Sequence, residues 1–428
     1  MRSLPLTLLA LIASIVLPSI AHATPPDVFG YGARTQALGM TGVSYADDYE
    51  AVFANPAGLG AQRKMGLALG LQGATFQLEL DGERFALDGH QGSTIGLHLP
   101  LPFGGPLEDV ITLGAGFFTP SNTVLRTDII FPELPQMAVI ARTQSVVLQL
   151  GMGLNLDKLV PGLRLGFGVS GLANIGGRLL VEVNEAQQFV SQTETQLLAS
   201  FNPLVGAQLD LGNFSLGLVW RDKVRSDIDL SVEVTGLGGL TLPTITITAI
   251  PQYDPHTVAL EGAWRNEHWL LALNLTYRRW SQWPGVVGKT TEDSLLPPHP
   301  DFRDTVSPRL GVEYRATRRR TTAALRFGYA YEMTPAPKAR LAPGRDSEGA
   351  PRDEQLPLRY LDSDRHVVTA GGGTRYRSRI GLDVRFDAFL QMHTMVERTH
   401  DIPAPSGTSN MVTNGWILAG GWSIGLDW

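Results

Sequence analysis

The sequence has no cysteine, and beyond residue 23 it has no long uninterrupted run of apolar residues. Without cysteine the chain cannot form a disulfide, a thiolate metal site or a cysteine nucleophile. Without a second apolar run of about 20 residues it is not a helical membrane protein. Basic residues are not in excess either. The net charge is −6, which argues against a nucleic-acid-binding protein.

Motifs for catalysis are missing as well. Ser170 does not lie in the G-x-S-x-G elbow of hydrolases, and no H-E-x-x-H zinc motif occurs. The three glycines at 371–373 are not followed by the Lys-Ser/Thr of a phosphate-binding loop. We therefore expect no catalytic residue, no metal site and no cofactor, and we do not expect an enzyme.

The N-terminus has the pattern of a secretory signal peptide. Arg2 precedes an apolar run over 4–20, and residues 21–23 form a small-x-small cleavage pattern. A membrane anchor is the alternative, but the run is short for a span of about 20 residues and contains two prolines. We expect residues 1–23 to be removed, so that the mature chain begins at Thr24.

What the sequence does contain is strict alternation of apolar and polar residues. In the final segment one face is apolar, with Trp416, Leu418, Trp422, Ile424, Leu426 and Trp428. The other face is small or polar, with Gly415, Gly421, Ser423, Gly425 and Asp427. Strands of about ten residues with an apolar face toward lipid and a polar face toward a wet lumen are typical of transmembrane β-barrels. A soluble β-sandwich also alternates, but its strands are shorter, at about 5–6 residues.

The same alternation recurs along the chain. It covers 146–154, 163–169, 214–220, 258–264, 269–277, 310–314, 325–331 and 380–392. Several of these segments have Trp or Tyr near an end, where an interfacial aromatic girdle would lie. The 47 glycines recur inside this alternation, and this predicts crowded, twisted strands.

Loop lengths provide an independent test. Long connections at 119–141, 175–197, 280–306, 333–364 and 393–412 alternate with short ones at 157–162, 212–213, 266–267, 317–320 and 377–378. Long external loops and short periplasmic turns are the rule for outer-membrane barrels. Alternation within a further long connection, 222–255, predicts a hairpin beyond the membrane. We expect an all-β fold, a transmembrane antiparallel β-barrel of about 14 strands over residues 65–428.

Residues 24–64 do not fit the barrel, because they lack alternation and are rich in glycine and small residues. A barrel of this circumference is too wide for side chains alone to fill. We therefore expect this segment to fold into the lumen as an N-terminal hatch, or plug.

This segment also carries a family resemblance. Its motifs are GYGAR at 30–34, ALGMTG at 37–42 and AVFANPAGL at 51–59. In this order they resemble the N-terminal hatch of the FadL family of outer-membrane transporters for long-chain fatty acids and hydrocarbons. Later stretches, including YDP at 253–255 and PRLGVEY at 308–314, resemble the family as well. The final residue, Trp428, stands where such barrels more often end in Phe.

The resemblance implies an outer-membrane channel for passive uptake of long-chain fatty acids or similar hydrophobic compounds. Cargo would be captured at an external apolar groove, pass to a buried pocket and leave sideways where a strand is kinked, after the hatch shifts. A cargo of aromatic hydrocarbons is an alternative, and so is a FadL-like barrel that acts as a surface-protein or secretion scaffold. A general diffusion porin is disfavoured because it would need an open lumen without a hatch.

The gating residues are expected in the hatch, at Phe53, Asn55, Pro56 and Ala57. Asn-Pro makes a rigid turn for two reasons. Pro fixes its own φ and restricts the residue before it, and the Asn side chain hydrogen-bonds the nearby backbone. The turn would hold the plug closed. A turn with no gating role is an equally open alternative.

Ligand capture is expected at the loop 119–141, which is far too apolar for an ordinary solvated loop. The residues concerned are Leu125, Ile129, Ile130, Phe131, Leu134 and Met137. Arg126 and Arg142 would attract a carboxylate head group or pair with local acids. In the alternative interpretation, these apolar residues pack on neighbouring loops as a lid.

The expected partners follow from this location. They are a long-chain fatty acid or other hydrophobic small molecule, outer-membrane lipids and lipopolysaccharide, and the barrel-assembly machinery, which would recognise the C-terminal strand ending in Trp428. We expect a monomer that binds no nucleic acid.

Overall fold

The computed structural model describes residues 25–85, 89–121, 125–126, 136–137, 144–183, 189–235, 245–285, 299–338, 340–346, 350–358, 360–404 and 407–428. The expected signal peptide lies outside these ranges. No helix in them is long and apolar enough to cross a membrane.

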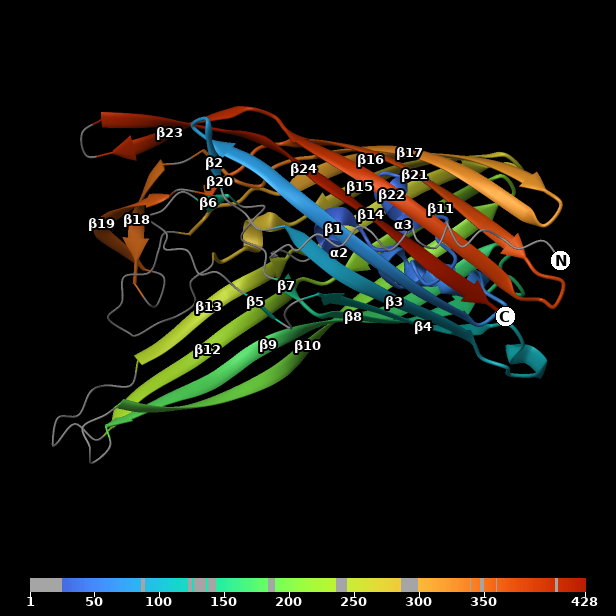
Figure 1. Ribbon diagram of the computed structural model, residues 1–428, viewed down its shortest axis with the longest axis horizontal. Coiled ribbons are helices and arrows are strands. Elements are labelled where there is room, and N and C mark those ends of the chain that lie inside the picture. The colour runs from blue at the N-terminus through green and yellow to red at the C-terminus, as the bar shows by residue number, and fades with distance from the viewer. Residues whose placement is uncertain are drawn as a thin grey trace, which may run out of the picture.

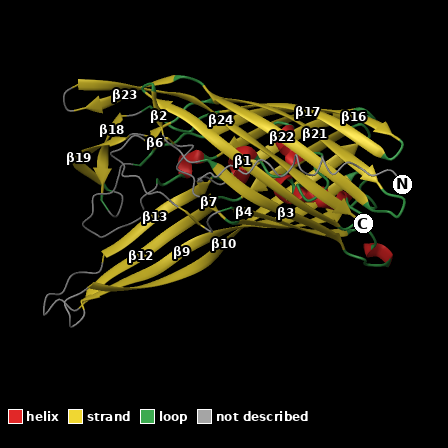
Figure 2. Ribbon diagram, in the orientation of Figure 1, coloured by secondary structure: helices red, strands yellow, loops and turns green. Residues whose placement is uncertain are grey.

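Fourteen antiparallel strands form the wall of a closed β-barrel (Figures 1 and 2). They are β1 (Gly66–Leu80), β3 (His90–Pro100), β4 (Ile111–Pro120), β8 (Val147–Asn155), β9 (Leu163–Val183), β10 (Phe189–Leu211), β11 (Phe214–Arg221), β14 (Thr257–Arg265), β15 (Trp269–Arg278), β16 (Thr305–Arg318), β17 (Thr321–Glu332), β21 (Arg365–Arg377), β22 (Asp383–Met395) and β24 (Gly407–Asp427). Each pairs with the next, and β1 pairs with β24 from Gly66↔Asp427 to Leu80↔Thr413, which closes the sheet. The predicted fold is confirmed.

The wall of the barrel is apolar on its outer face and polar on its inner face, the reverse of a soluble protein. On β15, Leu273 and Leu275 are 66% and 54% exposed, whereas the intervening Asn274 is 2% exposed. Because closure satisfies the backbone groups within the sheet, the apolar outer face can meet lipid without an unpaired edge.

The two ends of the barrel differ. Short turns gather at one end, which also holds the C-terminus, and Met65 and Trp428 pair their backbones there. One such turn contains η2 (Gly105–Leu107). Long connections lie at the opposite end. We refer to these as the short-turn end and the long-loop end.

Additional strands extend the long-loop end. The predicted hairpin is present as β12 (Val224–Thr235) and β13 (Ile245–Asp254), and β12 also pairs in parallel with β9. These three strands and β10 project beyond the barrel (Figure 1). The remaining elements are β2 (Glu83–Phe85), β5 (Leu125–Arg126), β6 (Gln136–Met137), β7 (Gln144–Ser145), β18 (Arg340–Arg345), β19 (Pro351–Leu358), β20 (Tyr360–Leu361), β23 (Arg398–Ala404) and η3 (Trp280–Gln282).

One predicted strand begins later than its alternation indicates. Ile380 and Leu382 continue the apolar face of β22, yet β22 starts at Asp383 and Ile380 is 86% exposed in the turn. Gly381 adopts a φ of 88°, in the left-handed region that turns use and strands do not. The turn at Gly381, and not the alternation, therefore determines where β22 begins.

Residues 25–64 lie inside the barrel and are called here the N-terminal segment. It contains α2 (Pro25–Phe29), α3 (Ala33–Ala37), α4 (Ala51–Ala54) and the 3-10 helix η1 (Pro56–Ala61) (Figure 1). Most of its side chains are buried, including Leu38, Val52 and Leu59 at 0% exposure.

A row of inward-facing glycines brings the barrel wall into contact with this segment. Paired strands place them side by side, as Gly96↔Gly116, Gly114↔Gly151, Gly153↔Gly166, Gly166↔Gly206 and Gly311↔Gly328. A Cβ at Gly206 would overlap Oδ1 of Asn55, and a Cβ at Gly328 would overlap the backbone N of Gly39. The segment therefore approaches the wall more closely than any larger residue allows.

We predict that Gly206→Ala lowers the free energy of unfolding by about 1–3 kcal/mol, because the added methyl group overpacks a filled contact. Urea unfolding in detergent, followed by the loss of heat-resistant migration on gels, measures the change. The matched control is Gly262→Ala on β14, whose Cβ would lie 3.7 Å from Cδ2 of Leu216, an ordinary contact. Equal stability of the two variants would contradict the prediction.

Candidate functional site

The four residues predicted for gating lie together in the structure. Phe53 is in α4, Asn55 follows it with an extended backbone, and Pro56 and Ala57 open η1. Oδ1 of Asn55 accepts the N–H of Ala57 at 3.1 Å, and Pro56 occupies the first helical position, where a missing N–H costs nothing. The local turn is the one that Asn-Pro favours. Its gating role stays a prediction.

Asn55 also joins the segment to the wall. Its Nδ2 donates to the carbonyls of Val43 at 2.8 Å, Ala207 at 3.0 Å and Leu218 at 3.3 Å. The two last carbonyls belong to β10 and β11, so one fully buried amide connects two parts of the segment with two wall strands.

A second anchor comes from Glu261 on β14. Its carboxylate accepts the backbone N–H groups of Gly42 and Ser44 at 2.9 Å each, the Ser44 hydroxyl at 2.8 Å and the amide of Asn274 at 3.0 Å. Both oxygens of this buried carboxylate are thus satisfied, and they fix the chain between α3 and α4 to the wall.

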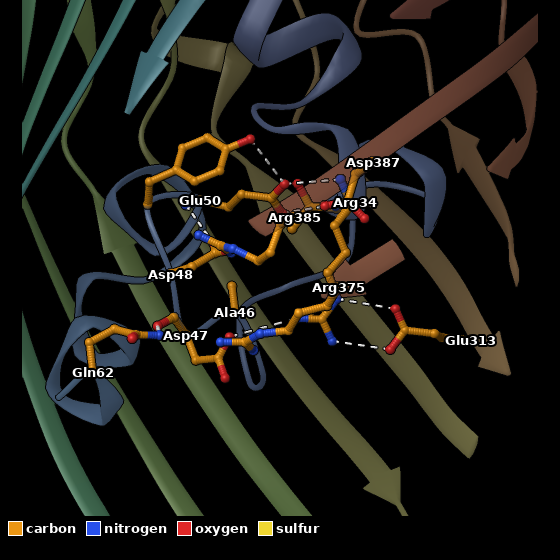
Figure 3. Close-up of polar contacts among 12 residues, drawn as sticks. Arg34, Ala46, Asp47, Asp48, Glu50, Gln62, Glu313, Arg375, Arg385 and Asp387 are labelled. Carbon is orange, nitrogen blue, oxygen red and sulfur yellow. Dashed lines mark hydrogen bonds and ion pairs between the residues drawn. The ribbon is translucent and has the colours of Figure 1, made fainter. Parts of the chain in front are cut away.

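Toward the short-turn end the segment is held by ion pairs (Figure 3). Glu313 on β16 accepts two hydrogen bonds from Arg34 at 3.2 Å and one from Arg326 at 2.6 Å, and Arg315 lies 3.2 Å away. Arg326 also pairs with Asp387 at 2.6 Å. Glu313 is 1% exposed, and this one carboxylate compensates the buried guanidinium of Arg326 together with the half-buried ones of Arg34 and Arg315.

Two acids of the segment, Asp48 and Glu50, complete the network. Burial raises the pKa of Glu50 to about 8, and the Asp48 carboxylate acts in the same direction. Burial would also raise the pKa of Asp48, but the Arg385 guanidinium, with which it pairs, holds it below its usual range. The oxygens of Glu50 accept the N–H groups of Arg34 and Thr35 at the start of α3.

The N-terminal segment separates cavities that face opposite ends of the barrel. On the short-turn side is a vestibule of about 250 Å³, lined by Arg34, Asp47 and Asp48 of the segment and by wall arginines. On the long-loop side lie two cavities of about 50 Å³ each. The first, called the Arg278 cavity, is lined by Arg221, Arg278 and Arg309. The second, called the Leu172 cavity, is lined by Val147, Leu172, Leu204 and Val224.

A cluster of aromatic rings lies nearer the long-loop end. Trp283 contacts Phe302 with ring centroids 4.3 Å apart and Tyr360 with centroids 5.2 Å apart, and Trp280 and Tyr253 extend the cluster. The rings are buried although most of them come from connecting segments and short elements, and they give this end an apolar interior.

The residues predicted for ligand capture are placed only in part. Leu125 is in β5 and Met137 is in β6, whereas Ile129, Ile130, Phe131 and Leu134 lie outside the described residues. β6 pairs in parallel with β20, which places Met137 opposite Leu361, next to Tyr360 of the aromatic cluster. The capture role stays a prediction.

Sequence reasoning did not single out Glu261, Glu313, Arg221 or the aromatic cluster. A local signal exists for Glu261, which interrupts the otherwise apolar or small-residue stretch of β14 before Arg265. It is weaker for Glu313, because β16 also contains arginines. Their partners are distant in sequence, at separations of 217 residues for Ser44 and 279 for Arg34, and no local pattern gives those contacts. In the described ranges no group of three or more His, Asp or Glu side chains is arranged to hold a metal ion.

The closed sheet, its outward apolar face and its filled lumen define an outer-membrane β-barrel. The chain belongs to the family described as outer membrane protein transport protein (OMPP1/FadL/TodX), which matches residues 147–423, more than half of the sequence. The family comprises outer-membrane channels for hydrophobic compounds.

Individual relatives agree with this assignment. Alkane uptake protein A of Marinobacter nauticus is 26% identical over 248 residues, which cover 55% of this chain and 50% of the relative. The chain thus spans about half the length of this curated relative. A Pseudomonas aeruginosa FadL homologue has a TM-score of 0.58 at 16% identity, covering 96% of this chain and 98% of that one. The Pseudomonas putida toluene transporter TodX has a TM-score of 0.57 at 16% identity, covering 94% of this chain and 99% of that one. At 16% identity, these two similarities show the fold alone.

We predict that Glu313→Gln destabilises the barrel by about 3 kcal/mol, because it leaves the buried guanidinium of Arg326 and its two half-buried neighbours without their shared carboxylate. Reversible urea unfolding in detergent micelles measures the loss. Asp109→Asn is the control, since Asp109 pairs with Arg63 at 3.5 Å with both side chains well exposed. Its effect should be below about 1 kcal/mol. A Glu313 variant as stable as this control would show that the network contributes little.

Proposed function

We propose that this barrel mediates passive uptake of long-chain fatty acids or similar hydrophobic compounds across the outer membrane, with its short-turn end in the periplasm. One observation carries most weight: the N-terminal segment fills the barrel between the vestibule and the two cavities on the long-loop side. A general diffusion porin needs an open polar lumen. A channel in which an apolar cargo moves between successive binding sites does not need one.

Capture occurs at the long-loop end. The residues that act there are Leu125, Ile129, Ile130, Phe131, Leu134 and Met137. The pairing of β6 with β20 brings this loop to Tyr360, so the capture surface continues into the aromatic cluster with Trp283 and Phe302. Aromatic and aliphatic surface of this kind suits an acyl chain or a hydrocarbon and has no catalytic group to alter it.

The N-terminal segment acts as the hatch, with Phe53, Asn55, Pro56 and Ala57 as its gating residues. Phe53 lines both small cavities, and the Asn55 turn lies directly beneath it, bonded to β10 and β11. A movement of this turn therefore changes the cavities and the contact with the wall together.

Asn55→Ala is expected to raise the uptake rate severalfold while assembly stays normal. The substitution removes the two N–H donors that three carbonyls share, at about 0.5–1.5 kcal/mol for each hydrogen bond, and so loosens the hatch. The initial rate of labelled palmitate uptake by intact cells measures the effect. Asn266→Ala is the control, because Oδ1 of Asn266 accepts the backbone N–H groups of His268 and Trp269 in an exposed short turn. Identical uptake by both variants would leave Asn55 with a structural role only.

The decisive experiment is uptake of labelled long-chain fatty acid by cells that lack their own transporter and carry this protein, with surface assembly verified. Restored uptake supports the proposal. Competition by alkanes or by toluene then identifies the preferred class of cargo. No uptake by an assembled barrel would refute fatty acid transport.

A role as a scaffold for a surface protein is the second candidate. The observation in its favour is the set of strands that project past the barrel, namely β9, β10, β12 and β13, with the separate β18–β19 hairpin. Specific pull-down of one surface protein, lost on deletion of the β12–β13 hairpin, would support it. In either role we propose a monomer embedded among outer-membrane lipids and lipopolysaccharide, assembled by machinery that recognises the final strand ending in Trp428.

A further inference from the structure

The short-turn end carries a cluster of exposed arginines on two adjacent turns (Figure 1). One turn joins β16 to β17 and the other joins β21 to β22, and the N–H of Arg377 donates to the carbonyl of Arg320 at 2.9 Å between them. Six exposed arginines on these turns and the adjoining strand ends are called here the basic rim: Arg318, Arg319, Arg320, Arg375, Arg377 and Arg379. The rim is a local excess of positive charge on a chain whose net charge is −6.

The acids near the rim are buried and do not neutralise its exposed side. Asp383 is 1% exposed, and it pairs with Arg375 at 3.2 Å, Arg377 at 3.7 Å and Lys64 at 3.4 Å. Arg375 also reaches the buried Asp427 at 3.4 Å. Within the described ranges, the remaining rim arginines form no ion pair with a carboxylate. Like charges held together in this way repel one another and produce a positive field in the solvent.

Arg319 has a backbone conformation that arginine disfavours. Its φ is 57°, in the left-handed region, where a residue with a Cβ is strained. In three other short turns the position with a positive φ is occupied by glycine, namely Gly162, Gly212 and Gly381. The β16–β17 turn thus has an arginine where a glycine would relieve strain. Strain of this kind is common at functional sites.

The rim faces the opening of the barrel and not the lipid. Arg375 and Arg377 line the vestibule, whereas Tyr376 between them is 49% exposed on the opposite, lipid-facing side of β21. A headgroup in the bilayer would lie on the Tyr376 side and would not reach both arginines. The vestibule, at about 250 Å³, is too small for a folded domain. The geometry therefore fits an extended anionic chain that approaches from beyond the membrane.

We propose that the basic rim is a docking site for an acidic segment of a periplasmic protein. The Asp and Glu carboxylates of the segment accept hydrogen bonds from the rim guanidinium groups. Arginine suits such a partner better than lysine, because its planar fork offers two parallel N–H donors to one carboxylate. The N-terminal segment stays in place, and the cargo takes no part in the contact. This inference rests on the proposed function only for the orientation, with the short-turn end in the periplasm, and it adds a partner there.

The first test measures binding of a fluorescent glutamate–serine repeat peptide to the full-length protein in phosphatidylcholine nanodiscs. A glutamine–serine peptide of equal length gives the uncharged background. Combining Arg318→Gln, Arg319→Gln and Arg320→Gln should weaken binding of the acidic peptide about tenfold, because each exposed charge pair contributes modestly.

The matched control removes the same number of exposed cations at the long-loop end, with Lys338→Gln, Arg340→Gln and Arg345→Gln. It should change the affinity less than about twofold. Equal weakening by the two sets of substitutions would show that the peptide responds to overall charge, and the docking site would be overturned.

Arg319→Gly separates a role in docking from a role in the turn. Glycine accepts the left-handed conformation without strain, so the midpoint of urea unfolding should equal or exceed that of the wild type. The loss of one rim charge should weaken binding of the acidic peptide about twofold or more. Unchanged affinity in this stably folded variant would contradict the docking site.

A lipid occupant is tested with the same variants. If the Gln substitutions in the rim leave the peptide affinity unchanged and instead lower the amount of phosphatidylglycerol that copurifies with the barrel, the rim binds headgroups and the proposal is overturned. Expected is the opposite result, with weaker peptide binding and equal phosphatidylglycerol.

The results also distinguish this inference from the proposed function. If the wild type binds the acidic peptide through the rim but takes up no palmitate, the transport function fails and the docking site stands. If it takes up palmitate but binds the acidic peptide no better than the glutamine peptide, the docking site fails and the transport function stands.

Discussion

The close approach of the N-terminal segment to the barrel wall is the contact on which the rest of the interior depends. Gly166 leaves room for the segment's backbone and Gly206 for the side chain of Asn55, and this room lets Asn55 reach carbonyls of two wall strands. A Cβ at either glycine would displace the segment and break these bonds. Because these glycines have no side chain, the segment can approach the wall closely enough for the polar anchors to form.

The anchors differ along the barrel axis in a way that fits their surroundings. Toward the short-turn end, Glu313 and Arg385 hold the segment through ion pairs that are shielded from lipid by the closed sheet. In the middle, Glu261 binds backbone N–H groups. Toward the long-loop end the contact is that of the Arg221 guanidinium with an aromatic face and two carbonyls. The ion pairs therefore lie away from the long-loop end, where we propose that cargo arrives, and the contact without an ion pair lies next to it.

The wall was predictable because its determinants are local. Alternation locates strands, and short polar turns locate their ends, so the fourteen-strand barrel follows from the sequence. Ile380 shows the limit, since a glycine in the turn displaced the strand start that alternation indicated. The glycines indicated crowded strands, but a sequence pattern does not say what crowds them. The contacts of Glu261 and Glu313 join residues more than 200 positions apart, so they require the closed barrel to be known first.

The distribution of the segment's partners also bears on the order in which the molecule is made. Residues 25–64 emerge before every wall strand, yet they bind groups on β10, β14, β16 and β22. Until those strands are joined, the segment has almost nothing to hold. A finished barrel, in turn, offers little space for threading a folded segment past its glycines. Residues 25–64 therefore reach their final conformation only once those strands are in place, although they precede every wall strand in the sequence.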